Sequence, residues 1–229
     1  MTDEEIDTIL QRASGSAPRV DPALLKRIAA QMNSSLRPVR PLLARWVLSS
    51  GLALSCAALA VAVGAMTGFS GVEKLTLWKS VMILSTLGIL LWVAAKSLVN
   101  HVIPGSRHPL SALAILIGVT AALLGVFALA FQDYRLDHFV SDGLPCLRTG
   151  LLVAVPAAAL IGLLLRRGFA VNALTAALAA GVLAGLCGVT MLELHCPNFL
   201  ALHVLVWHTA VVPVSAAAGV LVARALRRR

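Results

Sequence analysis

Six long runs of apolar residues constrain how this chain can fold more than any other feature. They cover residues 47–69, 77–98, 110–131, 147–165, 169–192 and 199–222, and charges, prolines or short polar loops separate them. An apolar helix of about 20 residues is long enough to cross the hydrocarbon core of a bilayer. The sequence therefore predicts an all-α integral membrane protein with six transmembrane helices, preceded by a short N-terminal segment.

The overall composition excludes an ordinary soluble domain. Hydrophobic residues make up 59% of the 229 residues, and charged residues make up only 13%. A soluble fold of this size could not keep so much apolar surface away from water. The lipid bilayer is therefore the expected environment of most of the chain.

The net charge of +9 could suggest binding to nucleic acid, but the positions of the basic residues favour another explanation. Basic residues are dense beside the ends of alternate apolar runs, and the other ends hold few, namely Lys74, Lys79, Arg135 and Arg148. The dense set consists of Arg37, Arg40, Arg45, Lys96, Arg107, Arg166, Arg167, Arg224, Arg227, Arg228 and Arg229. Because cytoplasmic loops of membrane proteins carry an excess of Lys and Arg, this pattern places both termini in the cytoplasm. We expect a membrane protein that does not bind nucleic acid directly and whose basic charge mainly sets its topology.

Residues 1–45 form a polar segment that is distinct from the membrane domain, residues 46–229. Asp21-Pro22 has the pattern of an N-cap followed by proline at the first helical position. Two short amphipathic helices are predicted, whose apolar faces carry Ile6, Ile9, Leu10, Leu24, Leu25 and Ile28. The segment can be a flexible tail or lie on the membrane surface, or it can dock against a cytoplasmic protein.

Residues 195–208 hold the densest group of chemically versatile side chains in the chain. They include His195, Cys196, His203 and His208, and thiol and imidazole groups are the side chains best suited to metal binding or redox chemistry. The predicted topology places Cys146 and Cys196 at the extracytoplasmic surface, on adjacent loops. These two thiols could form a disulfide or share a metal ion. Two further cysteines, Cys56 and Cys187, lie inside apolar runs and are expected to be buried small hydrophobes.

Helix geometry limits which of these residues can act together. If Pro197 begins the sixth helix, His203 and His208 are separated by roughly 140° around a straight α-helix and cannot bind the same metal ion. Cys196 and His203 would share a face but lie roughly 10 Å apart along it. A metal site would then need a ligand from another helix, for which Cys146 is the candidate. The possible metal ligands are Cys146, Cys196, His195, His203 and His208. The alternative role for the histidines is hydrogen bonding to neighbouring helices.

Two charged residues accompany the cysteines near the predicted membrane boundary. Arg148 follows Cys146, and Glu193 precedes Cys196. Ionisable groups at such positions usually pair with one another or mark a functional site. We therefore expect an ion pair between Arg148 and Glu193.

The order of these features resembles the NrsF-type membrane regulators, which are negative regulators of extracytoplasmic-function (ECF) sigma factors. The matching segments are Leu36-Arg37-Pro38-Val39-Arg40-Pro41, Pro145-Cys146-Leu147-Arg148-Thr149-Gly150 and His195-Cys196-Pro197, followed by His203 and Trp207-His208. The resemblance covers nearly the whole chain. It implies an anti-sigma factor that holds an ECF sigma factor at the bacterial inner membrane and releases it when a heavy metal or an oxidant acts on Cys146 and Cys196. The sigma factor would dock on the N-terminal apolar faces, because that segment lacks the cysteines and histidines of a zinc-binding anti-sigma domain.

Two other classes of function remain as alternatives. A membrane thiol oxidoreductase or a haem protein could use the extracytoplasmic cysteines or the histidines, but the chain has no CxxC pair. A small transporter would need more polar residues within the spans than this chain offers. We therefore predict a protein that is not an enzyme and requires no cofactor. A divalent or soft metal ion could act as its signal.

Overall fold

The computed structural model describes residues 3–15, 21–35, 44–103, 110–136, 138–165 and 172–227. The chain divides into two compact units, Met1–Pro41 and Leu42–Arg229, and each is described here by itself. Throughout the described residues the regular structure is helical and contains no strand, which confirms the predicted all-α class.

The first unit contains two short helices, α1 (Asp3–Gly15) and α2 (Pro22–Ser35). The Asp21 carboxylate accepts a hydrogen bond from the backbone amide of Ala23 at 2.9 Å, so Asp21 caps α2 as its sequence pattern predicts. The side chains of the predicted apolar faces are exposed at Ile6, Ile9, Leu24, Leu25 and Ile28. The Leu10 side chain lies outside the described part. Within the described part of this unit, therefore, no other element covers these exposed apolar side chains, and a partner can bind them.

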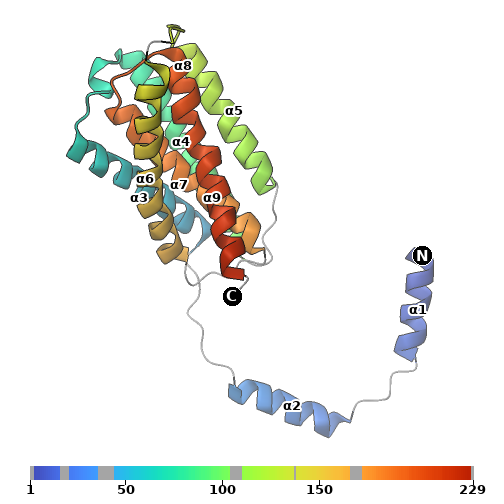
Figure 1. Cartoon of the computed structure of the whole chain (residues 1–229). Helices are drawn as coiled ribbons and strands as arrows, with labels where there is room; N and C mark the ends of the chain where they lie inside the picture. Colours follow the sequence, from blue (N-terminus) through green and yellow to red (C-terminus); the bar gives the residue numbers. More distant parts are fainter. Residues whose placement is uncertain are drawn as a thin grey trace. The chain divides into compact units, whose positions relative to one another are not determined.

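The second unit contains six helical segments that are long and apolar enough to cross a membrane (Figure 1). They are α3 (Arg45–Thr67), α4 (Leu77–Val102), α5 (Ala112–Ala130), α6 (Phe139–Leu165), α7 (Ala173–His195) and the combined segment Ala201–Arg227. That last segment consists of α8 (Ala201–His203), a π-helical turn (Val204–His208) and α9 (Thr209–Arg227). A single 3₁₀ turn (Val72–Lys74) lies between α3 and α4.

The fourth and sixth spans begin at different residues from those expected. Helix α6 begins at Phe139 rather than at residue 147, because its first turns are polar and exposed at Ser141 and Asp142 and so escape a search for apolar runs. The sixth segment begins at Ala201 and not at Pro197. The backbone amide of Ala201 donates instead to the Asp133 carbonyl at 2.7 Å, in the loop that follows α5.

Helix α7 is the centre of the bundle. Almost every residue from Ala179 to Leu194 is buried, whereas the other spanning helices bury only one face. Glycines allow this close packing: a Cβ atom at Gly188 would overlap the backbone carbonyl of Gly150 in α6, and one at Gly181 would meet the backbone of α9 at Ser215. Helices α6 and α9 therefore lie directly against the backbone of α7.

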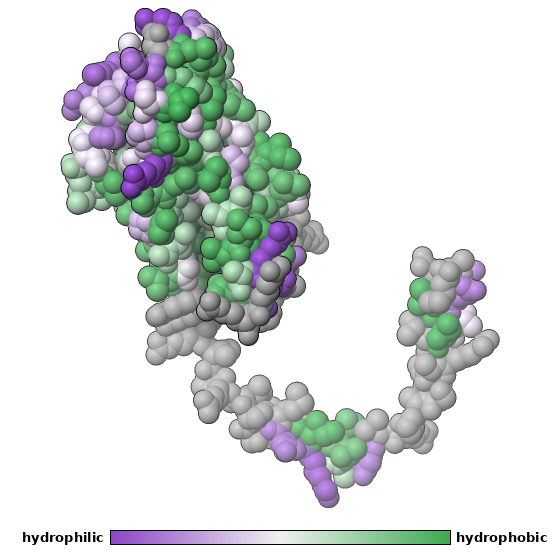
Figure 2. Space-filling model, viewed as in Figure 1, coloured by the Kyte–Doolittle hydropathy of each residue, from purple (hydrophilic) through white to green (hydrophobic). Residues whose placement is uncertain are grey.

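The outer surface of this unit is apolar around its sides. Large hydrophobic side chains such as Leu54, Met66, Ile89, Leu129 and Leu163 are exposed. On the face in view, Figure 2 shows hydrophobic residues along the side of the unit and hydrophilic residues mostly towards its ends. A surface of this kind is stable next to lipid chains and unstable in water. The unit is therefore built as a membrane protein.

Part of the charge pattern used to predict topology falls on residues that the structure describes. Arg45 lies at the start of α3, Lys96 in the last turns of α4, and Arg224 and Arg227 at the end of α9. The remaining members of the set, Arg37, Arg40, Arg107, Arg166, Arg167, Arg228 and Arg229, lie outside the described residues. The loops after α3, α5 and α7 meet at the opposite end of the bundle.

Candidate functional site

The site lies where these three loops meet, at one end of the bundle. The Ser70 hydroxyl donates a hydrogen bond to the His195 carbonyl at 2.5 Å, which joins the α3–α4 loop to the end of α7. The Ala201 amide bonds to Asp133 and so joins the α5–α6 loop to the start of α8. Cys196 follows α7 directly, between these two fixed points, so its position is set by backbone contacts on both sides.

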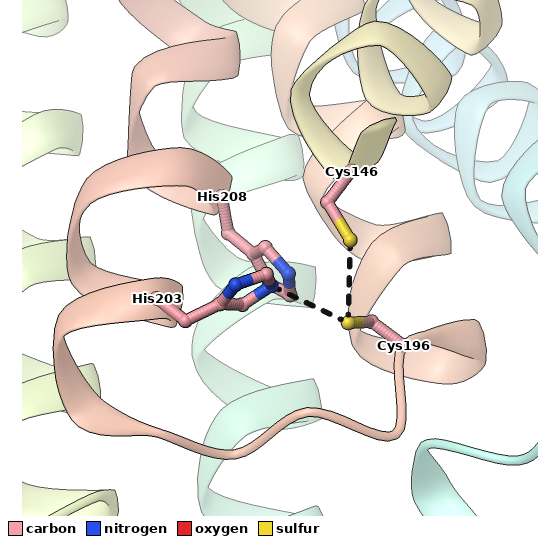
Figure 3. Close-up of side chains that lie close together, drawn as sticks. All are labelled: Cys146, Cys196, His203 and His208. Carbon is pink, nitrogen blue, oxygen red and sulfur yellow. Dashed lines mark hydrogen bonds between the residues drawn. The ribbon is translucent and has the colours of Figure 1, made fainter. Parts of the chain in front are cut away.

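The two thiols that the sequence placed at this surface lie in contact. Cys146 from α6 and Cys196 from the α7–α8 loop have their Sγ atoms 3.5 Å apart (Figure 3). Cys196 is buried and Cys146 is half-buried. The hydrogen bond with Cys146 and burial both raise the pKa of the Cys196 thiol, and either sulfur can be the donor in this pair.

Both histidines of the sixth segment join the thiols. The Nε2 atom of His203 lies 3.6 Å from Cys196 Sγ, and the rings of His203 and His208 have their centroids 5.3 Å apart. One potential ligand atom from each of Cys146, Cys196, His203 and His208 lies within 4.8 Å of the others. Figure 3 shows the four side chains converging from α6, the α7–α8 loop and the sixth segment.

The expectation that His203 and His208 lie roughly 140° apart around their helix is wrong. It assumed a straight α-helix, whereas the residues between them form a π-helical turn, Val204–His208. In a π-turn the hydrogen bonds run from residue i to residue i+5, so two residues five apart lie on nearly the same side. The predicted separation of Cys196 from His203 is wrong for a related reason, because residues 197–200 are not helical and fold Cys196 back over the histidine.

The predicted ion pair between Arg148 and Glu193 is also wrong. Glu193 is buried, and its Oε1 atom lies 2.6 Å from Nδ1 of His208. Arg148 is exposed, because two residues of α-helix turn it roughly 200° from Cys146, which faces the bundle. Glu193 therefore belongs to the site through a histidine and not through the arginine.

His195 lies outside the four-residue group. Its Nδ1 atom is 3.1 Å from the Gly68 carbonyl, and the residue is half-buried. Of the five candidate metal ligands in the sequence, the structure therefore brings four together and places His195 in a contact between loops.

Trp207 and Gly143 form a supporting contact that the sequence did not reveal. The Trp207 ring packs against Gly143 so closely that a Cβ atom there would overlap it, and its centroid lies 5.4 Å from that of Phe139. The contact fixes the first turns of α6 against the π-turn. The only signal in the sequence is a glycine in the segment Asp142-Gly143-Leu144-Pro145, which has the composition of a loop.

The other two cysteines behave as predicted. Cys56 and Cys187 are fully buried in the core, where the Cys187 thiol donates to the backbone carbonyl of Cys56 at 3.2 Å. They are part of the helix packing and are separate from the site at the end of the bundle.

Comparison with protein families gives a decisive match. The family model NrsF, described as negative regulator of sigma F, matches residues 32–228. The chain belongs to this family. Comparisons with curated proteins and with solved structures found no match. The matched region of this NrsF-family protein includes the whole helical bundle and all four clustered residues, but it leaves out α1 and most of α2.

Membership in the NrsF family has two direct consequences. The protein is a negative regulator of a sigma factor, so a sigma factor is its partner in general terms. Its family role is regulatory rather than catalytic. A regulatory role in a membrane protein is therefore the role to seek for the clustered thiols and imidazoles.

Proposed function

We propose that this NrsF-family protein is an anti-sigma factor of the bacterial inner membrane that sequesters an ECF sigma factor. A heavy metal or an oxidant in the extracytoplasmic space acts on Cys146 and Cys196 and causes release. The observation that carries this proposal is the direct contact of the two thiols, whose Sγ atoms lie 3.5 Å apart at one end of the bundle.

The two thiols can respond to either class of signal. A soft metal ion binds thiolates in preference to oxygen ligands, and two adjacent sulfurs supply half of a tetrahedral site. An oxidant such as hydrogen peroxide can take two electrons from the pair. The two thiols then lose their protons, one S–S bond forms, and the peroxide leaves as two molecules of water.

Either reaction would alter the packing of the helices that carry the thiols. A disulfide requires an S–S distance of about 2.05 Å, so the present 3.5 Å separation has to shorten. Cys146 belongs to α6, whereas Cys196 follows α7, and these two helices are in backbone contact at Gly150 and Gly188. A packed contact of this kind shifts between discrete arrangements, which lets a small change at one end reach the other end of the helices.

The N-terminal unit is the proposed docking element for the sigma factor. Its exposed apolar side chains, with Leu10 as the remaining member of the predicted set, suit an amphipathic helix that binds in a groove of a partner. The positive-inside rule places this unit in the cytoplasm, where a sigma factor is found.

The test uses the full-length chain in membranes together with the ECF sigma factor of the same organism. We expect the sigma factor to copurify with the detergent-solubilised chain from untreated cells and to be lost after exposure to Cd²⁺ or diamide. Cys146→Ser and Cys196→Ser should retain the sigma factor under both treatments. Leu24→Asp combined with Leu25→Asp should lose it under all conditions.

Two results would overturn separate parts of the proposal. Failure of the wild-type chain to retain any sigma factor, in any redox or metal state, would remove the anti-sigma function. Equal retention before and after treatment would keep that function and remove the sensing role of the two cysteines.

A further inference from the structure

We propose that Cys146, Cys196, His203 and His208 bind one divalent cation of the zinc and cadmium class in a tetrahedral site, and that Glu193 positions His208 for this binding. This site would give the proposed sensing function a defined metal signal, and its biological meaning rests on that function. The binding itself can be measured on the purified chain without any sigma factor, so the two proposals can fail independently.

The distances between the ligand atoms match those of a tetrahedral S₂N₂ site. With metal–sulfur bonds of about 2.3 Å and metal–nitrogen bonds of about 2.05 Å, tetrahedral angles place two sulfurs about 3.8 Å apart and a sulfur and a nitrogen about 3.6 Å apart. The Sγ atoms of Cys146 and Cys196 are 3.5 Å apart, and Cys196 Sγ is 3.6 Å from His203 Nε2. The group therefore needs only small side-chain movements to surround a cation.

One ring nitrogen of His208 contacts Glu193, and the other is free to bind a metal ion. Nδ1 lies 2.6 Å from the Glu193 carboxylate, while Nε2 is buried and has no hydrogen-bond partner. Metal-bound histidines commonly donate their second N–H to a carboxylate, which fixes the ring and makes the other nitrogen a better ligand. A buried nitrogen without a partner is also unfavourable in itself, and a metal ion would satisfy it. Glu193 is therefore a positioning residue that acts through His208.

The charges of such a complex suit a buried position. Two thiolates neutralise a divalent cation, and neutral imidazoles add no net charge, so the metal and its four ligands are neutral as a unit. The remaining negative charge is the Glu193 carboxylate, which is hydrogen-bonded to His208. Isolated charges are costly to bury, whereas compensated ones are tolerated. Cys196, His203 and His208 are all buried, which favours an ion held directly by the side chains over a hydrated ion.

The ligand types narrow the class of metal. Two sulfurs and two imidazoles favour Zn²⁺ and Cd²⁺ over Mg²⁺ and Ca²⁺, which require oxygen ligands. Among the described residues, Cys146, Cys196, His203 and His208 form the group of potential ligands that lie close enough together to hold a metal ion. Its four members come from α6, the α7–α8 loop and the sixth segment, so one bound ion would link three parts of the bundle.

The test is a titration of the purified full-length chain in detergent with Co²⁺, whose absorption spectrum reports tetrahedral geometry and sulfur ligation. We expect one Co²⁺ per chain, with intense visible d–d bands and a sulfur-to-cobalt charge-transfer band. Addition of Zn²⁺ or Cd²⁺ should abolish these bands by displacement. Cys146→Ser should remove most of the charge-transfer band.

The histidines distinguish this site from a simple pair of thiols. His203→Asn and His208→Asn should each weaken Co²⁺ binding at least tenfold, and His203→Cys should restore it with stronger charge transfer, which shows that the variant chain is folded. The matched control is His195→Asn, whose imidazole contacts Gly68 outside the site, and it should bind Co²⁺ like the wild type.

Two results would overturn this assignment. A tetrahedral spectrum that is unchanged in His203→Asn and His208→Asn would limit the ligands to the cysteines. Absence of any sulfur–cobalt band in the wild type would exclude the site altogether. Both results would leave sigma-factor binding, and its response to oxidants, open to the separate test above.

Discussion

At the scale of single residues, Glu193 determines what His208 can do. A buried carboxylate at the end of a transmembrane helix is costly unless it is paired, and here its partner is the imidazole at 2.6 Å. The pair fixes the orientation of the ring and directs Nε2 away from Glu193. Glu193 was expected to pair with Arg148, but it is part of the candidate metal site through His208.

Replacement of Glu193 tests this positioning role. We expect Glu193→Gln to weaken Co²⁺ binding by about 10-fold to 100-fold without changing the shape of the spectrum, because an amide holds His208 less strongly but all four ligands remain. The matched control is Asp142→Asn, which also converts a carboxylate to an amide near the site but on an exposed residue whose carboxylate accepts hydrogen bonds from Asn198 and Ser141. Equal effects of the two substitutions would contradict the role of Glu193.

The two thiols cannot bind a metal ion and form a disulfide at the same time, since both states use the same Sγ atoms. We therefore expect saturating Zn²⁺ to slow oxidation of Cys146 and Cys196 by diamide at least tenfold. Alkylation followed by mass spectrometry measures the fraction of disulfide over time. The buried pair Cys56 and Cys187 serves as an internal reference, and an unchanged rate at the site would contradict the shared-ligand geometry.

At the scale of secondary-structure elements, the site depends on how α6 is seated against the π-turn. The fit is tightest at Gly143, where the Trp207 ring leaves no room for a side chain. Further along the same helix, Gly150 meets the backbone of α7 at Gly188. Cys146 lies between these two contacts, so the position of its sulfur follows from backbone packing on both sides.

An alanine at Gly143 should separate α6 from the π-turn. In a helix, Gly→Ala alone is favourable by about 1 kcal/mol, but forcing Trp207 to move costs roughly 1–3 kcal/mol. We expect Gly143→Ala to lower the thermal midpoint in detergent and to weaken Co²⁺ binding. Gly162→Ala, in the same helix with no neighbouring atom within 4 Å, should leave both unchanged or raise the midpoint. A Gly143→Ala variant as stable and as tight-binding as Gly162→Ala would show that this contact is dispensable.

The sequence predicted the elements better than it predicted the site. Apolar runs are long and uniform, so they locate spanning helices reliably, and they fail only at boundaries such as the polar first turns of α6 and the start of the sixth segment. The π-turn left no comparable signal, because Val204–His208 has the same composition as an ordinary spanning helix. The five-residue spacing of His203 and His208 matches one π-turn, but the sequence alone does not show that a π-turn forms there.

At the scale of the whole molecule, the direction of the chain across the membrane decides which signals can reach the thiols. The predicted topology places the loops after α3, α5 and α7 outside the cytoplasm and the end of α9 inside it. This orientation is predicted from the basic residues beside the ends of the spans, such as Arg45, Lys96 and Arg224.

Cysteine labelling tests this orientation directly. In a chain with Cys146→Ser and Cys196→Ser, we expect Glu73→Cys, on an exposed position of the 3₁₀ turn, to react with a membrane-impermeant maleimide in cells with a permeabilised outer membrane. Arg224→Cys, exposed near the end of α9, should react only after the inner membrane is opened. The reverse pattern would place the site in the cytoplasm and remove an extracytoplasmic signal.

The central position of α7 has a consequence for how the molecule is made. Synthesis proceeds from the N-terminus, so α3, α4, α5 and α6 enter the bilayer before the helix around which the bundle packs. Until α7 is synthesised, Gly150 lacks its backbone contact with Gly188, and the earlier helices lack the buried helix against which they pack. The ribosome therefore completes the N-terminal unit first and the Cys–His cluster almost last. A chain cut short after α6 would carry the first without the second.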